Sequence, residues 1–134
     1  VREVETFHDD RGGALRGTNT VRVFTAGGLS AVHLGDLGHQ LTVEQAAAIG
    51  PVDAVLVPVG GVYTVDAAGA KAVCDALHPR CVVPMHYHHA PYGLTEVDSV
   101  EPFLELWPAE EVHHLQGAAF KLTEQTTGVM VPSF

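Results

Sequence analysis

The sequence predicts an α/β fold in which helices cover a sheet. Segments with strand character alternate with segments of helix character along the 134 residues. Residues 53–59 form a continuous apolar run rich in valine, as expected of a strand that is covered on both faces. The length is enough for one domain with a substantial core, residues 1–134, and short for two.

Three strands are expected at the start of the chain, at residues 1–7, 20–26 and 29–34. In the second of them valines alternate with Arg22 and Phe24, which is typical of a strand with two different faces. The Gly-Gly pair that follows is a hairpin signal leading into the third strand.

Two helices are expected in the middle of the chain. Residues 42–50 begin with a Thr-x-x-Gln capping box and end at Gly-Pro. Residues 66–78 begin with an aspartate, a preferred helix-capping residue, and end before a proline. The strand 53–59 lies between the two helices, and a further buried strand is expected at 80–85.

The last part of the chain predicts one helix and two short strands. Apolar residues recur at i, i+3, i+4 and i+7 before Pro108, an amphipathic pattern; they are Val100, Phe103, Leu104 and Trp107. Residues 111–131 indicate two short strands around Gly117 and Thr127-Gly128.

Composition argues against several functional classes. Seven Lys and Arg against 16 Asp and Glu give a net charge of −9, whereas nucleic-acid binders need clustered positive charge. The longest nearly apolar run, 54–63, is too short and too rich in glycine to span a bilayer, and no signal-peptide pattern begins the chain. Cys74 and Cys81 are expected as free core thiols, which suits the reducing cytoplasm.

Three side chains with metal-ligand chemistry, His8, Asp36 and His86, stand at or just beyond predicted strand ends. Imidazole and carboxylate groups from separate strand ends commonly assemble a site for a divalent metal. Each also has a structural interpretation: His8 as a turn histidine, and Asp36 as a turn residue that accepts nearby backbone N–H groups. His86 directly follows an apolar strand and is expected at the mouth of the sheet.

Further polar residues are weaker candidates. His33 is expected to be buried and hydrogen-bonded, or to support Asp36 from behind, and His39 to do the same or to face the pocket. Tyr63 and His88 are candidates for contact with substrate. The remaining polar residues are assigned structural places, with His113 and His114 on opposite faces of a strand, one at the surface and one in the core; they are Asp53, Asp66, His89, His113 and His114.

Four segments together resemble the second half of a metallo-β-lactamase-fold metal-dependent hydrolase, in the branch of the ascorbate-phosphate lactonases and related bacterial hydrolases. The resemblance extends from about residue 5 to residue 107 and rests on "HDDRGGALRGTNTVRVF", "GGLSAVHLGDLGHQLT", "VDAVLVPVGGVYTVDAAGA" and "PRCVVPMHY". It implies the second half of an αββα sandwich. It further implies that His8 and His86 each bind one of two divalent ions, Zn or Mn, and that Asp36 bridges them.

The resemblance also has a large departure. The family's His-x-His-x-Asp-His signature, which belongs to the first half of the fold, is absent from the sequence. His86-x-His88 begins like it, but Ala90 and Pro91 stand where the aspartate and histidine belong. The chain is therefore expected to carry about half of a site, as a fragment whose first half is separate or as a remnant without catalysis.

The resemblance implies a hydrolase that uses metal-activated water on an ester, lactone, amide or phosphodiester bond of a small molecule, with Asp36 catalytic. The alternative is a non-catalytic dimerising or scaffold module, because a half-fold leaves an apolar sheet surface uncovered. The expected partner for that surface is a second copy of the chain or the missing N-terminal half.

Overall fold

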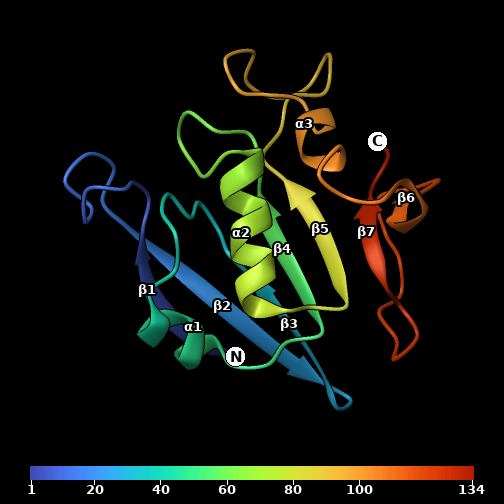
Figure 1. Cartoon of the computed structure of the whole chain (residues 1–134), viewed down its shortest axis with the longest axis horizontal. Helices are drawn as coiled ribbons and strands as arrows, with labels where there is room; N and C mark the ends of the chain where they lie inside the picture. The colour runs from blue at the N-terminus through green and yellow to red at the C-terminus, as the bar shows by residue number, and fades with distance from the viewer.

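A single seven-stranded sheet organises the computed structural model, which describes residues 1–134 (Figure 1). The strand order is β1-β2-β3-β4-β5-β7-β6. The strands are β1 (Arg2–Phe7), β2 (Thr18–Ala26), β3 (Leu29–His33), β4 (Ala54–Pro58), β5 (Cys81–Met85), β6 (Val112–His114) and β7 (Gly128–Val131). The predicted α/β class is confirmed, and the five strands up to residue 85 start and end within two residues of their expected positions.

Most strands of the sheet run in one direction. β2 is antiparallel to both β1 and β3, whereas β3, β4, β5, β7 and β6 are paired in parallel. As a result β1, β3, β4 and β5 all end at the same edge, the upper one in Figure 1. The loops that leave this edge contain every candidate metal ligand, so the topology brings distant parts of the sequence together.

The chain forms three helices, of which the first two begin and end where local chemistry predicts. They are α1 (Val43–Ile49), α2 (Ala67–Leu77) and α3 (Glu101–Leu104), with a 3-10 turn at Ala109–Glu111. At α1 the Gln45 backbone N–H donates to Thr42 Oγ1 and the Thr42 N–H donates to Gln45 Oε1, a complete capping box. Asp66 caps α2 by accepting the Gly69 N–H at 2.8 Å. No helix has both the length and the apolar character needed to cross a membrane.

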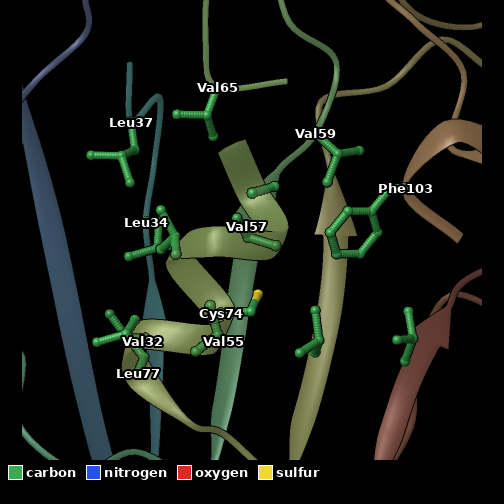
Figure 2. Packing of buried hydrophobic residues seen from close by; sticks show 14 of the residues in the cluster. Val32, Leu34, Leu37, Val55, Val57, Val59, Val65, Cys74, Leu77 and Phe103 are labelled. Atoms are coloured by element: carbon green, nitrogen blue, oxygen red, sulfur yellow. The ribbon is translucent and has the colours of Figure 1, made fainter. Parts of the chain in front are cut away.

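The main core lies between the sheet and the helices. Helix α2 lies in front of β3 and β4 in Figure 1, and Figure 2 shows Cys74 of this helix next to Val55 and Leu77 next to Val32. Twenty-two buried residues form this cluster. Fully burying a valine or leucine side chain contributes about 1.5–3 kcal/mol, so this face accounts for most of the apolar stabilisation.

The sheet face away from α2 is also apolar. The strand register places Ala54 beside Cys81 and Leu56 beside Val83, on the opposite face from the main core. Leu115 and Leu122, from the segment between β6 and β7, pack on part of this face. Phe24, which lies opposite Ala31 across β2 and β3, stays 45% exposed. The face is therefore only partly covered.

The amphipathic pattern before Pro108 gives a shorter helix than predicted. Only Glu101–Leu104 is helical, although Val100, Phe103 and Leu104 are buried as the pattern requires. After Leu104 the chain tightens into i→i+3 hydrogen bonds, from the Leu106 and Trp107 N–H groups. A residue that precedes proline is disfavoured in the helical conformation, so the helix does not extend through Trp107.

The assignment of one of His113 and His114 to the core is wrong, because both are exposed. They alternate between faces as predicted, but β6 is a three-residue strand at the edge of the sheet, where both histidines stay exposed. The prediction for the cysteines is confirmed: Cys74 and Cys81 are buried and unpaired.

Candidate metal site

A cavity of about 350 Å³ opens at the edge where β1, β3, β4 and β5 end. His8, Asp36 and His86 all line it, each from a different loop. The three residues singled out as candidate ligands are thus brought to one place, although 78 positions separate the first from the last in sequence (86 − 8). Tyr63 lines the same cavity.

The loop that carries His8 is held by its neighbour Asp9. The His8 N–H donates to the Gly17 carbonyl at 3.0 Å, which closes the loop. The buried Asp9 carboxylate accepts four backbone N–H groups at 2.7–2.9 Å, from Arg11, Gly13, Leu15 and Arg16. Burial raises the pKa of Asp9, but the four donors together outweigh it and lower the pKa to about 2. His8 therefore begins a rigid loop.

Asp36 is positioned by Asn19, a residue of β2. The Asp36 N–H donates to Asn19 Oδ1 at 2.9 Å. Asn19 Nδ2 in turn donates to the Leu34 carbonyl and to Oγ1 of the buried Thr6, both at 2.9 Å. A Cβ at Gly35 would lie 2.5 Å from Asn19 Oδ1, so this turn needs glycine. The sequence analysis missed Asn19; its one signal is that asparagine is unusual within a strand.

The Asp36 loop also packs directly on the end of β1. The Gly38 N–H donates to the Phe7 carbonyl at 2.9 Å, and a Cβ at Gly38 would overlap the backbone of His8. His39 Nε2 accepts the Phe7 N–H at 3.1 Å, and its Nδ1 donates to the Gln40 carbonyl at 2.7 Å. Both ring nitrogens of His39 are occupied by the backbone, so this histidine joins two loops and does not line the cavity. Of the two glycines that flank Asp36, Gly35 is in close contact with Asn19 and Gly38 with the backbone of His8.

His86 is the first residue after β5 and has an unusual backbone conformation. Its φ of 58° lies in the left-handed region, which residues other than glycine seldom adopt and which occurs often at functional sites. A Cβ at Gly60 would overlap the His86 carbonyl oxygen, so the two loops are in close contact. This conformation places His86 Nδ1 at 3.3 Å from Asp36 Oδ1.

The donors fit a divalent ion in their chemistry. Neutral imidazole nitrogens and a carboxylate are ligands that Zn and Mn both accept. Asp36 and His86 are already in contact, and His8 lines the same cavity. No three His, Cys, Asp or Glu side chains of the chain lie close enough together to hold an ion by themselves.

The remaining candidates occupy different places. His33 is half-buried, and its Nδ1 accepts the Gly35 N–H at 3.0 Å, so it supports the turn before Asp36. Burial lowers the pKa of His33, and the neighbouring His86 acts in the same direction. His88 does not line the cavity; its backbone N–H donates to the Asp98 carbonyl at 2.9 Å.

Two aspartates have the structural roles expected of them. Asp66 caps α2, as described above. Asp53 accepts the Ser30 N–H at 2.8 Å and Arg80 Nη2 at 3.0 Å, which ties the starts of β3, β4 and β5 together at the edge opposite the cavity. The Ser30 N–H and the Arg80 side chain lower the pKa of Asp53.

Comparison with known proteins identifies similar chains. Residues 1–86 match the sequence model of the beta-lactamase superfamily domain. A UPF0173 metal-dependent hydrolase of Carboxydothermus hydrogenoformans is 36% identical over 75 residues, which cover 56% of this chain and 33% of that protein. A second one, from Thermoplasma acidophilum, is 38% identical over 61 residues, covering 46% and 27%. The chain thus spans about a third or less of these relatives.

Solved structures give the same picture. The structure of a Thermotoga maritima protein, described as a candidate Zn-dependent hydrolase of the metallo-β-lactamase superfamily, superposes with a TM-score of 0.82 at 38% identity. The match covers 97% of this chain and 62% of that one. A candidate metal-dependent hydrolase of Parabacteroides distasonis shares the fold at 14% identity, with a TM-score of 0.60 over 97% of this chain and 49% of its own.

Proposed function

The chain belongs to the β-lactamase superfamily, and we propose that it forms part of a metal-dependent hydrolase to which it contributes His8, Asp36 and His86 as metal ligands. The observation that supports this most directly is that these three side chains, from three separate loops, line one cavity. The names of the similar proteins, metal-dependent hydrolases, support the same reaction class.

We propose that the ligand set is completed from outside this chain. Asp36 and His86 are in contact, yet no group of three potential ligands is close enough to hold an ion. The missing ligands would come from a preceding half of the fold or from a second copy of the chain. Two divalent ions, Zn or Mn, would then be shared between this chain's donors and those of its partner.

The reaction we propose is hydrolysis of an ester, lactone, amide or phosphodiester bond in a small molecule. A bound divalent ion supplies Lewis acidity, which acidifies water and polarises the oxygen of the bond under attack. This chain's part is to hold donors in fixed positions. Asn19 fixes the Asp36 backbone, and the contact between Gly60 and His86 fixes the third loop. The reduced, buried thiols support the expectation that the protein works in the cytoplasm.

Two experiments test this proposal. Titration of the 134-residue chain with Zn²⁺, followed by NMR of the histidine rings, is expected to shift the signals of His8 and His86 before that of the exposed His114. In the protein that includes the preceding half, His8→Ala, Asp36→Ala and His86→Ala are each expected to lower hydrolysis of a panel of esters and lactones at least about 100-fold. His114→Ala is the matched control. Unchanged hydrolysis in the three variants would refute the assignment.

A second candidate function, association through the sheet, is favoured by the partly covered face away from α2. Phe24 is 45% exposed there, and an apolar patch of this kind promotes binding to another protein surface. We propose that a second copy or the preceding half of the fold covers it. Sedimentation of the chain, with Phe24→Asp as the variant, tests self-association: a dimer that dissociates in the variant supports it, and a monomer at all concentrations contradicts it.

A further inference from the structure

The wall of the cavity beyond the candidate ligands is apolar. Tyr87, Leu94 and Val97, from the segment after β5, contribute side chains to it. Leu94 is 56% exposed. A ligand in the cavity that covered this large apolar side chain would gain binding free energy from the apolar area removed from water. Ligand sites are typically lined by apolar and aromatic side chains with a few polar groups that fix orientation. His8, Asp36 and His86 are such polar groups here.

Positive charge is absent from this wall. None of the ten lining residues is lysine or arginine, and the one acidic residue among them is Asp36. The chain as a whole carries a net charge of −9. A phosphate or carboxylate on the part of a substrate away from the reacting bond would lose water without gaining a cationic partner, which costs free energy.

Arg16 contacts Tyr63, one of the residues that line the cavity. The Arg16 guanidinium lies 5.4 Å from the centroid of the Tyr63 ring, and the Tyr63 hydroxyl donates to Glu96 Oε1 at 2.8 Å. These three residues come from the loops after β1, β4 and β5, so they link three loops around the cavity. Glu96 raises the pKa of Tyr63, and Tyr63 lowers that of Glu96, so the neutral hydroxyl facing an ionised carboxylate is favoured. Arg16 and Glu96 carry opposite charges around Tyr63, so the rim adds no net positive charge that would favour an anionic ligand.

We propose that the cavity binds a neutral substrate whose unreactive part is an alkyl chain or similar apolar group lying against Leu94 and Val97. The proposal deepens the hydrolase function proposed above and depends on it for the reaction, but not for the binding. The apolar wall selects the unreactive part of the molecule, and the polar groups of the three loops orient the bond to be cleaved.

Binding of a homologous series of neutral probes to the 134-residue chain tests this proposal. The probes are γ-lactones with lengthening alkyl chains, from γ-butyrolactone to γ-decalactone, and binding is followed through the methyl NMR signals of Leu94 and Val97. A fully buried methylene is worth about a fourfold change in affinity, so we expect about a two- to fourfold gain per methylene until the cavity is filled. A γ-lactone of the same length as γ-octalactone whose alkyl chain ends in a carboxylate places a negative charge on the unreactive part, and it is expected to bind at least about tenfold more weakly than γ-octalactone.

The matched variants are Leu94→Ser and Leu106→Ser, because both leucines are exposed and only the first lines the cavity. We expect Leu94→Ser to remove most of the gain with chain length and Leu106→Ser to retain it. Val97→Thr keeps the side-chain volume and is expected to reduce the gain as well, which guards against a folding defect in the first variant.

Three results would overturn the proposal: affinity independent of chain length, tighter binding of the lactone with the terminal carboxylate than of γ-octalactone, or identical behaviour of Leu94→Ser and Leu106→Ser. None of these measurements uses hydrolysis. Loss of the chain-length dependence in a protein that hydrolyses lactones would therefore reject the apolar site alone. A clear chain-length dependence in a protein without hydrolytic activity would reject only the proposed reaction.

Discussion

The side-chain oxygen of Asn19 accepts the backbone N–H of Asp36 at 2.9 Å. Asn19 lies in β2, whereas Asp36 lies in the turn after β3, so a strand without any candidate ligand determines where a candidate ligand stands. The same side chain bonds Leu34 and the buried Thr6. The position of Asp36 in the site therefore depends on how β1, β2 and β3 are aligned with one another as well as on the residues of its own loop.

Replacing Asn19 tests this dependence. Asn19→Ala leaves the Asp36 N–H without its acceptor and the Leu34 carbonyl without its side-chain donor. A hydrogen bond of this kind contributes about 0.5–1.5 kcal/mol. Because the side chain of Asn19 makes three of them, we expect the free energy of unfolding to fall by about 1–3 kcal/mol. Urea denaturation followed by fluorescence of the single tryptophan, Trp107, which packs against Phe103, measures the change.

Thr18→Ala is the control, because Thr18 is the exposed neighbour of Asn19 on β2. An exposed substitution of this kind changes stability by less than about 0.5 kcal/mol. Equal effects of the two substitutions would mean that the Asn19 hydrogen bonds do not hold the turn.

The second prediction concerns the contact between the loops that carry His8 and Asp36. A Cβ at Gly38 would overlap the His8 backbone, which has no flexible end that can move aside. We expect Gly38→Ala to cost about 1–3 kcal/mol of stability, as other overpacked sites do, and to shift the backbone NMR signals of both loops. Gly117→Ala is the matched control, since a Cβ there meets no atom within 4 Å. If Gly38→Ala changed neither the stability nor the NMR signals of the two loops, the loops would not be in contact.

The ends of helices α1 and α2 and of strands β1 to β5 could be predicted because they depend on neighbours in sequence. The Thr42–Gln45 capping box is one example: both partners lie within one turn, and the structure contains both hydrogen bonds. The gathering of His8, Asp36 and His86 in one cavity was also within reach, because parallel strands end at one edge of a sheet. Local capping and turn signals, together with the rule that parallel strands end at one edge, therefore give the fold class and the location of the candidate site.

Contacts that depend on register or on loop shape were beyond the sequence. The hydrogen bond between Asn19 and Asp36 requires the alignment of β2 with β3. The hydrogen bond between Tyr63 and Glu96 joins two loops, and the sequence pattern does not indicate the path of either loop. The error at His113 and His114 has a related cause. Alternation along a strand separates two faces, but only tertiary structure decides whether either face is covered.

The third prediction concerns the reactivity of the two thiols. Burial raises the pKa of Cys74 to about 12 and that of Cys81 to about 11, with Arg80 opposing the second shift. The thiolate is the reactive form, so we expect neither cysteine of the folded chain to react with Ellman's reagent at pH 8. Both should react after denaturation in urea.

Ser133→Cys provides the control for this measurement, because Ser133 is exposed near the end of the chain. The added thiol is expected to react at once in the folded protein, while Cys74 and Cys81 stay silent. Rapid reaction of one native thiol in the unsubstituted chain would contradict the packing of α2 or β5 described above.

The fourth prediction concerns the acid stability of the loop that begins at His8. The carboxylate of Asp9 accepts four backbone N–H groups, and although burial raises its pKa, these donors lower the value from 3.8 to about 2. A carboxyl group whose pKa is lower in the folded chain stabilises that chain when ionised. The stabilisation is therefore complete above about pH 4 and disappears as the pH falls toward 2.

Asp9→Asn keeps one acceptor oxygen and replaces the other with an amide that cannot accept the Leu15 and Arg16 N–H groups. We expect the melting temperature to fall clearly at pH 7 and the difference from the unsubstituted chain to shrink as the pH approaches 2, because Asp9 then becomes protonated in the folded state as well as in the unfolded state. The exposed neighbour supplies the control, since Asp10→Asn removes only a surface ion pair with Arg11 at 3.6 Å. A difference that stayed constant from pH 7 to pH 2 would show that the amide fails for steric reasons and that charge on Asp9 does not hold the loop.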